Sequence, residues 1–116
     1  MKRHYRHFLE DIIEYSESAE SFVENMTFQE FEQDKKTYMA TVRALEVIGE
    51  AIRHIPEEIK QKYWEISWHE IIGFRNIVIH EYFGIDKSVV WNAATVDAPF
   101  LKEQISHILK HVEEDE

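Results

Sequence analysis

Four side chains able to do chemistry interrupt an otherwise apolar stretch, GFRNIVIHEYFG, at residues 73–84: Arg75, Asn76, His80 and Tyr82. A polar group taken out of water without a partner costs about 1–3 kcal/mol, and an unpaired charge costs much more. These four side chains therefore either lie on a surface or are retained for a use.

The pair of Arg75 and His80 suits phosphodiester chemistry. Histidine is the one side chain whose ordinary pKa lies near neutrality, so it can take up and return a proton, and arginine is a permanent cation that forks onto phosphate oxygens. In RNA the ribose 2′-hydroxyl is a built-in nucleophile, so a histidine base and an arginine clamp suffice without a metal. A lone histidine or arginine at the end of an apolar helix is more often a satisfied structural group, and on spacing alone both interpretations stay open.

The elements that must position these residues are predicted to be helices. Only three Gly and two Pro punctuate the 116 residues, apolar side chains recur at spacings of three and four, and no strand is predicted. Helices are expected over six ranges: about 2–25, a short segment through FQEFEQD, about 34–54, a short segment PEEIKQKYW, about 68–82, and 87 to about 112. Four of these are principal helices with short connections, which predicts an all-α antiparallel bundle of four to five helices in one domain over residues 1–116.

Capping residues and prolines set the expected ends of these helices. Thr27, with Glu30 as its capping-box partner, should begin the first short segment, and Asp86 should cap the last helix. Pro56 fits the first position of the second short segment. Pro99 should kink or interrupt the last helix after Val96, because proline lacks an N–H group and clashes with the preceding turn.

On a helical wheel the polar residues of the predicted 68–82 helix fall into two groups. At about 100° per residue, Asn76 and His80 lie with His69 in an arc about 60° wide. Arg75 and Tyr82 share a different arc, roughly 140° from His80. An ideal helix therefore does not direct Arg75 and His80 the same way. Either the arginine side chain wraps around, the helix is distorted near His80, or a second copy of the chain completes the group.

The composition bounds the classes of partner and compartment. The net charge of −10, from 13 Lys and Arg against 23 Asp and Glu, opposes broad capture of nucleic acid, so any RNA contact must be local. Cysteine is absent, which excludes disulfides and thiolate metal sites and is compatible with a reducing cytoplasm. Neither a signal peptide nor a transmembrane helix is expected, because the N-terminal stretch has no uninterrupted apolar run. We therefore expect a cytoplasmic protein without membrane contact.

The 34–54 helix carries a separate polar arc that could serve the motif. Glu46 and Glu50 could face it and hold Arg75. Arg43 and Arg53 share the same arc, however, which favours a solvated face of ion pairs at spacings of three and four. These glutamates are therefore left out of the catalytic set.

Three further groups have a functional and a structural interpretation. Glu103, His107 and His111 are spaced four apart and could bind a divalent metal, although a helix dipole also favours histidines in its last turns. A basic N-terminal patch could contact phosphate or be a solvated helix start: Arg3, His4, Arg6 and His7. Three tryptophans at helix ends are expected to wedge the bundle or line a dimer interface rather than to stack on bases: Trp64, Trp68 and Trp91.

An ordered set of segments resembles the HepT-like toxin branch of the HEPN-domain proteins: LEVIGEA, HIPEEIKQKY, SWHEIIGFRN and HEYFGIDKSVVW. The resemblance covers nearly the whole chain, and RNIVIHEY matches the Arg-x4-His-x-Tyr signature of that family. Phe74 stands where many relatives have Met or Leu, which is a variation in packing.

The resemblance implies a HEPN-like bundle, usually a homodimer, that acts as an RNA-cleaving toxin beside an MNT-type nucleotidyltransferase antitoxin. Arg75 and His80 match the catalytic pair, Asn76 matches the supporting polar position, and Tyr82 matches the tyrosine that the partner adenylylates. The implied enzyme is a metal-independent ribonuclease without a cofactor, with RNA and the antitoxin as partners. The alternative is a catalytically inactive helical module that binds a nucleotidyltransferase or a nucleotide.

Overall fold

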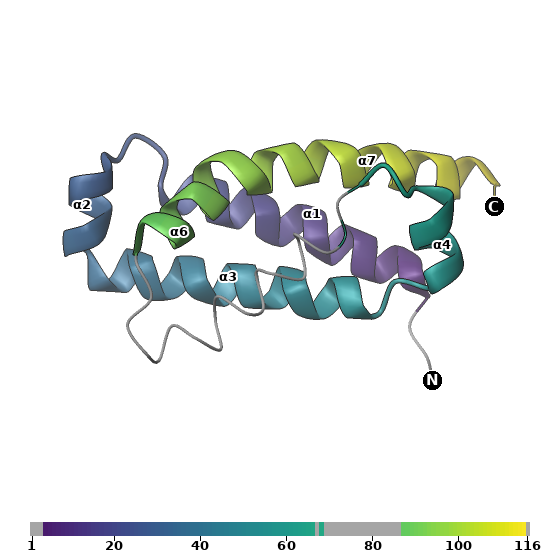
Figure 1. Ribbon diagram of the computed structural model, residues 1–116, viewed down its shortest axis with the longest axis horizontal. Coiled ribbons are helices and arrows are strands. Elements are labelled where there is room, and N and C mark those ends of the chain that lie inside the picture. Colours follow the sequence, from purple (N-terminus) through teal and green to yellow (C-terminus); the bar gives the residue numbers. More distant parts are fainter. Residues whose placement is uncertain (1–3, 67, 69–86, 116) are drawn as a thin grey trace.

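The computed structural model describes residues 4–66, residue 68 and residues 87–115, and these residues form helices (Figure 1). The elements are α1 (Tyr5–Phe22), α2 (Phe28–Gln33), α3 (Lys35–Arg53), α4 (Glu57–Lys62), α6 (Lys87–Asn92), the π-helix η1 (Ala93–Asp97) and α7 (Ala98–Asp115). No strand occurs in this part of the chain, and the predicted all-α class is confirmed. The predicted helix over 68–82 lies outside the described residues, apart from Trp68.

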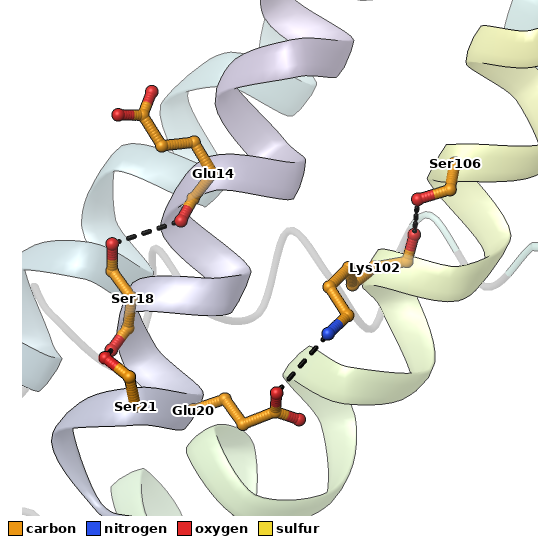
Figure 2. Close-up of polar contacts among 6 residues, drawn as sticks. All are labelled: Glu14, Ser18, Glu20, Ser21, Lys102 and Ser106. Atoms are coloured by element: carbon orange, nitrogen blue, oxygen red, sulfur yellow. Dashed lines mark hydrogen bonds and ion pairs between the residues drawn. The ribbon is translucent and has the colours of Figure 1, made fainter.

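Helix α1 lies between α3 and α7 and packs against both of them (Figure 1). Its direction is opposite to theirs, as the predicted antiparallel arrangement requires. An ion pair ties α1 to α7 across their seam, with Lys102 Nζ 3.3 Å from Glu20 Oε1 (Figure 2). On the same two helices the hydroxyls of Ser18 and Ser106 donate to backbone carbonyls one turn earlier, so these polar groups are satisfied locally (Figure 2).

The buried line of α1 differs from the predicted apolar stripe. Sequence periodicity places Tyr5, Phe8, Ile12, Tyr15, Ala19, Phe22 and Val23 on the core side. The predicted burial of Ile12, Ala19 and Val23 is confirmed, and the predicted aromatic residues Tyr5, Phe8 and Tyr15 are half-buried against the core. Leu9 and Ser16 are fully buried although they were not predicted, and Phe22 is 40% exposed, so its predicted burial is wrong. The small side chains at 16 and 19 allow neighbouring helices to approach closely, which moves the line of contact away from the bulky aromatic residues.

The start of α3 is fixed by a side-chain cap. Asp34 accepts hydrogen bonds from the Thr37 backbone N–H at 3.0 Å and from the Thr37 hydroxyl at 2.7 Å. These bonds, the backbone bond first, stabilise the carboxylate and hold the pKa of Asp34 below its usual value. The polar arc predicted for this helix is confirmed: Arg43, Glu50 and Arg53 are exposed, and the opposite face forms the centre of the core.

The two short helices test the other predicted ends. The capping box of α2 is confirmed, with Thr27 Oγ1 accepting from Glu30 N at 3.1 Å and Glu30 Oε1 accepting from Thr27 N at 2.9 Å. Helix α4 begins one residue later than predicted, because Pro56 is its N-cap with extended backbone angles. It ends at Lys62, two residues before the end of the predicted segment PEEIKQKYW.

The interruption predicted near Pro99 occurs as a π-helical turn rather than as a break. Residues Ala93–Asp97 are π-helical, and the N–H of Ala98 donates to the carbonyl of Ala93, five residues earlier. The inserted residue relieves the contact that the proline ring would make with the preceding turn, so the helix continues through α7.

Candidate functional site

The predicted site residues lie in segment 69–86, outside the described residues: Arg75, Asn76, His80 and Tyr82. Their predicted roles in proton transfer, phosphate binding, support and modification stay predictions. The structure does describe the two residues that flank this segment, Trp68 and Lys87, and shows which contacts hold each of them in the bundle.

Trp68 is fixed at the end of α4. Its side chain is buried, and its indole N–H is shared between the carbonyl oxygens of Lys60 at 3.2 Å and Tyr63 at 3.1 Å. The last carbonyls of a helix have no partner within the helix, so this tryptophan closes α4 as well as filling the core. The wedging role predicted for Trp68 is thus confirmed.

Lys87 is fixed at the opposite end of α3. Its ammonium donates to the carbonyl of Glu32 in α2 at 3.0 Å and lies 5.0 Å from the centre of the Tyr38 ring. Trp68 and Lys87 are therefore anchored to different elements, Trp68 to α4 and the turn after it and Lys87 to α2.

Three hollows on the described surface are candidates for a binding site. The first, of about 300 Å³, lies between α1 and α3. Its cations are tied to carboxylates: Arg43 lies 2.8 Å from Glu46, and Arg53, just outside the lining, lies 3.3 Å from Glu50. These exposed pairs confirm the solvated, ion-paired face predicted for this arc, and pairs of this kind contribute little to stability.

His54 is part of the lining of this first hollow. Its ring stacks on Phe8 with 4.6 Å between centroids and 13° between planes, and its Nε2 lies 3.7 Å from Glu50 Oε1. The imidazole thus links the start of α1 to the end of α3. Its contacts are those of a structural histidine.

The second hollow, of about 450 Å³, lies among α2, α3 and the start of α6. Lys87, Tyr38 and the exposed Met39 line it. The ammonium of Lys87 is already bound to the carbonyl of Glu32, so it is occupied in holding α6.

The third hollow, of about 620 Å³, lies between α7 and the chain that follows α4. Ile66 and Ile108 are buried at its base, and Phe100 is 64% exposed beside it. Lysines, a histidine, glutamates and other polar groups complete the lining: Lys62, Tyr63, Glu65, Glu103, Gln104, Ser106, His107 and Lys110. Sequence reasoning did not single out Lys62, Phe100 or Lys110, because no local pattern joins Lys62 to residues 38 and 48 positions later.

The alternative metal site on α7 is not formed. Within the described ranges, no three His, Cys, Asp or Glu side chains are grouped so that they could hold a metal ion. The rings of His107 and His111 instead pack edge to face at 4.5 Å, and His111 Nδ1 lies 2.9 Å from the carbonyl oxygen of His107. Glu103 belongs to the lining of the third hollow.

The N-terminal basic residues are engaged at the start of α1. His4 is the N-cap and accepts from the backbone N–H of Arg6 at 3.0 Å, and Arg6 Nε lies 3.6 Å from Glu10 Oε1. This geometry supports the solvated helix start over a phosphate-binding patch. Arg3 lies outside the described residues.

The remaining tryptophans differ from one another. Trp91 is half-buried and packs against Phe31 and Phe28, at 5.3 Å and 6.0 Å between ring centroids, so it wedges α6 against α2 as predicted. Trp64 is 74% exposed, so it does not wedge the bundle, and the alternative that it lines a dimer interface stays a prediction.

No helix in the described ranges has both the length and the apolar character needed to cross a membrane.

Comparison with known proteins places this chain among ribonuclease sequences. The family model described as "Ribonuclease HepT-like" matches residues 12–108. A protein of Methanocaldococcus jannaschii named "Putative RNase MJ1216" is 42% identical over 112 residues, which cover 97% of this chain and 93% of that protein. A Thermococcus cleftensis protein named "Probable ribonuclease HepT" is 43% identical over 110 residues, which cover 95% of this chain and all of the relative. No solved structure matches.

Proposed function

The chain belongs to the HepT-like ribonuclease family, and on this premise we propose that it is a metal-independent endoribonuclease that uses Arg75 and His80. One observation carries the proposal: the match over residues 12–108 encloses RNIVIHEY, the stretch in which a titratable imidazole follows a permanent cation by five positions. Relatives with ribonuclease names cover almost the whole chain and support the same substrate class. The cysteine-free sequence is compatible with the cytoplasm, where we place this activity.

The proposed reaction is an attack by the ribose 2′-hydroxyl on the adjacent phosphorus. His80 takes the proton from that hydroxyl, and Arg75 stabilises the negative charge that develops on the phosphoryl oxygens. The new P–O2′ bond forms as the P–O5′ bond breaks, and the imidazolium of His80 returns the proton to the leaving 5′-oxygen. The products are a 2′,3′-cyclic phosphate and a 5′-hydroxyl. Asn76, one turn before His80, orients the imidazole.

A homodimer completes the proposed site. On an ideal helix Arg75 and His80 are directed roughly 140° apart, so one chain does not bring both side chains to one phosphate unless the arginine wraps or the helix distorts. A two-fold axis along the motif would set the Arg75 of one subunit against His80 of the partner subunit.

Adenylylation of Tyr82 is the proposed switch. In this proposal the chain is the toxin of a toxin–antitoxin pair, and an MNT-type nucleotidyltransferase transfers AMP to the Tyr82 hydroxyl with release of pyrophosphate from ATP. The added phosphate would place an anion and steric bulk close to Arg75, which neutralises the cation that the scissile phosphate requires. The RNA site would then be blocked.

The test of catalysis is cleavage of total RNA by purified protein in the presence of EDTA. The parent protein should cleave, and His80→Ala should lose cleavage, since general acid–base catalysis by one histidine contributes about 10²- to 10⁴-fold. His7→Ala removes a half-buried histidine outside the motif and should cleave like the parent.

Three outcomes would contradict the proposal. Equal cleavage by the parent and His80→Ala would mean a contaminant or a different site. Loss of cleavage in EDTA alone would mean a metal-dependent reaction. Absence of cleavage in a folded parent that still binds a nucleotidyltransferase or a nucleotide would favour the catalytically inactive module.

A further inference from the structure

We propose that the third hollow, between α7 and the chain following α4, is a subsite for single-stranded RNA, an inference that rests on the proposed ribonuclease function. A chain with a net charge of −10 can contact RNA only locally, so the surface that does so must differ from the rest. This hollow combines uncommitted lysines with exposed aromatic rings, which are the two components by which proteins hold single strands without reading their sequence.

The combination of unpaired lysines with an exposed aromatic ring distinguishes this hollow from the other two. In the first hollow the arginine ends in an ion pair with a glutamate of its own helix. The second hollow has one lysine bound to a backbone carbonyl, Lys87, and an exposed lysine, Lys35, but its aromatic ring, Tyr38, is buried. Lys62 and Lys110 have no ion pair with any carboxylate in the described part of the chain; Lys62 Nζ lies 5.6 Å from the centre of the Tyr63 ring. Both are exposed, so their ammonium groups can bind phosphate without breaking an existing bond.

The aromatic side chains provide surfaces on which bases can stack. Phe100 is 64% exposed, an unusual degree for a phenylalanine on a folded helix, and Tyr63 is half-buried in the same lining. Trp64, next to Tyr63 in the chain, is 74% exposed. A stacked base removes this apolar surface from water and places its phosphates toward the rim that holds the lysines.

The position of the hollow connects it to the proposed catalytic segment. Tyr63 lines it and also accepts the indole hydrogen bond of Trp68, the last described residue before segment 69–86. An RNA strand bound here therefore lies near Trp68, which precedes in the sequence the segment that carries the proposed catalytic pair. Its volume of about 620 Å³ is within the 300–1,000 Å³ typical of sites for small ligands, so it suits one or two nucleotides rather than a duplex.

The two glutamates in the lining shape what the subsite can hold. Glu65 and Glu103 balance the charge of the two lysines, so attraction to phosphate is weak and affinity depends on stacking. Carboxylates repel phosphate but accept hydrogen bonds from base amino groups, such as N4 of cytosine. The association constant should therefore fall only weakly as the salt concentration rises. Two phosphate contacts to a single strand give a slope of about −1.4 in a plot of log K against log salt concentration.

The test measures binding of a fluorescein-labelled 12-mer of 2′-O-methyluridine to the full chain by anisotropy at several KCl concentrations. This oligonucleotide lacks the 2′-hydroxyl nucleophile, so binding is measured without cleavage. Phe100→Ala should weaken binding about tenfold, within the range of one lost stacking contact. Lys62→Gln and Lys110→Gln should each reduce the salt slope by about 0.7.

Matched controls change the same residue types elsewhere on the surface. Phe22→Ala removes a 40% exposed phenylalanine of α1, and Lys36→Gln removes an exposed lysine at the opposite end of the bundle. Both should bind like the parent. Cleavage adds a second readout: the Phe100 and lysine variants should raise KM for a 12-mer RNA and leave cleavage of the dinucleotide UpA unchanged, because UpA is too short to span both sites.

The outcomes separate failure of the subsite from failure of the proposed catalysis. Unchanged binding of the 12-mer by Phe100→Ala would overturn the subsite while RNA cleavage by the parent leaves the catalytic proposal intact. A parent that binds the 12-mer through Phe100 but cleaves no RNA would overturn catalysis and leave the subsite. A change in sedimentation of Phe100→Ala with unchanged RNA binding would make this face a protein contact and overturn the RNA assignment.

Discussion

At the scale of single residues, the histidines show how little residue type alone reveals about role. His4 caps α1, His54 stacks on Phe8 beside Glu50, and His111 packs against His107. Each of these contacts explains its histidine without any reaction. Sequence spacing could not separate these roles from that of a general base, because a cap or a stack depends on a partner or geometry that the spacing does not specify.

Tyr82 carries the prediction at this scale. Co-expression with an MNT-type nucleotidyltransferase should add the mass of one or more AMP units to the parent chain, and Tyr82→Phe should lose that added mass because it lacks the acceptor hydroxyl. Tyr15→Phe, a half-buried tyrosine of α1, should keep the modification. Intact-mass measurement checks all three chains. A parent of unchanged mass, or an unchanged shift in Tyr82→Phe, contradicts the proposed switch.

At the scale of the elements, the cap of α3 gives a prediction about pH. The hydrogen bonds from Thr37 lower the pKa of Asp34, so the folded chain favours its carboxylate. A lowered folded pKa stabilises the fold above the unfolded pKa, and that contribution is lost as pH falls through the folded value. Asp34→Asn keeps a cap without the titration.

Calorimetry at several pH values checks this cap. The advantage in Tm of the parent over Asp34→Asn should be constant near neutrality and should shrink below about pH 4, where the unfolded carboxyl begins to bind its proton. An NMR titration of the Asp34 carboxyl gives the pKa directly. A midpoint at or above the ordinary aspartate value would contradict the structural account.

The elements were the most predictable part of the molecule. Three predicted features depend only on residues that are close together in the sequence: the capping box at Thr27, the start of the third helix at Asp34 and the polar arc of that helix. The buried line through Ser16 and the exposure of Phe22 do not, because they depend on how closely α1 approaches its neighbours. The Ser16 hydroxyl is buried with no hydrogen-bond partner in the described structure, which no periodicity argument would choose.

At the scale of the whole molecule, the proposed site requires two chains. Arg75→Ala and His80→Ala should each be inactive. Refolding the two variants together gives mixed dimers, about half of the total by random pairing, in which one intact Arg75 faces one intact His80 of the partner subunit. Cleavage should return to about a quarter of the parental rate if each site uses one cation and one imidazole from different chains.

Sedimentation of the mixture supplies the control for this experiment. No recovered cleavage in a dimeric mixture would mean that both groups act from one chain, by a wrapped arginine or a distorted helix. A monomeric parent that cleaves RNA would exclude the two-fold site altogether.

The overall arrangement also explains which parts of a site a sequence can predict. Arg75 and His80 are close in the chain, so their chemistry is visible as a motif. Lys62, Phe100 and Lys110 are joined only when α7 passes the end of α4, and the bundle alone reveals their grouping. The net charge of −10 predicted that any RNA contact would be local, and the comparison of the three hollows indicates where the described surface permits one.

The π-helical turn sets the rotational phase between the two halves of the last helix. Converting Ala93–Asp97 to an ordinary α-helical turn without removing a residue would rotate α7 by about 100° relative to α6. Either Leu101 and Ile105 would turn out of the core, or Lys87 would be carried away from Glu32. The π-helical turn thus takes up one extra residue. Because of it, Lys87 at one end of the last helix can bind Glu32 while the residues of α7 that line the third hollow keep their positions.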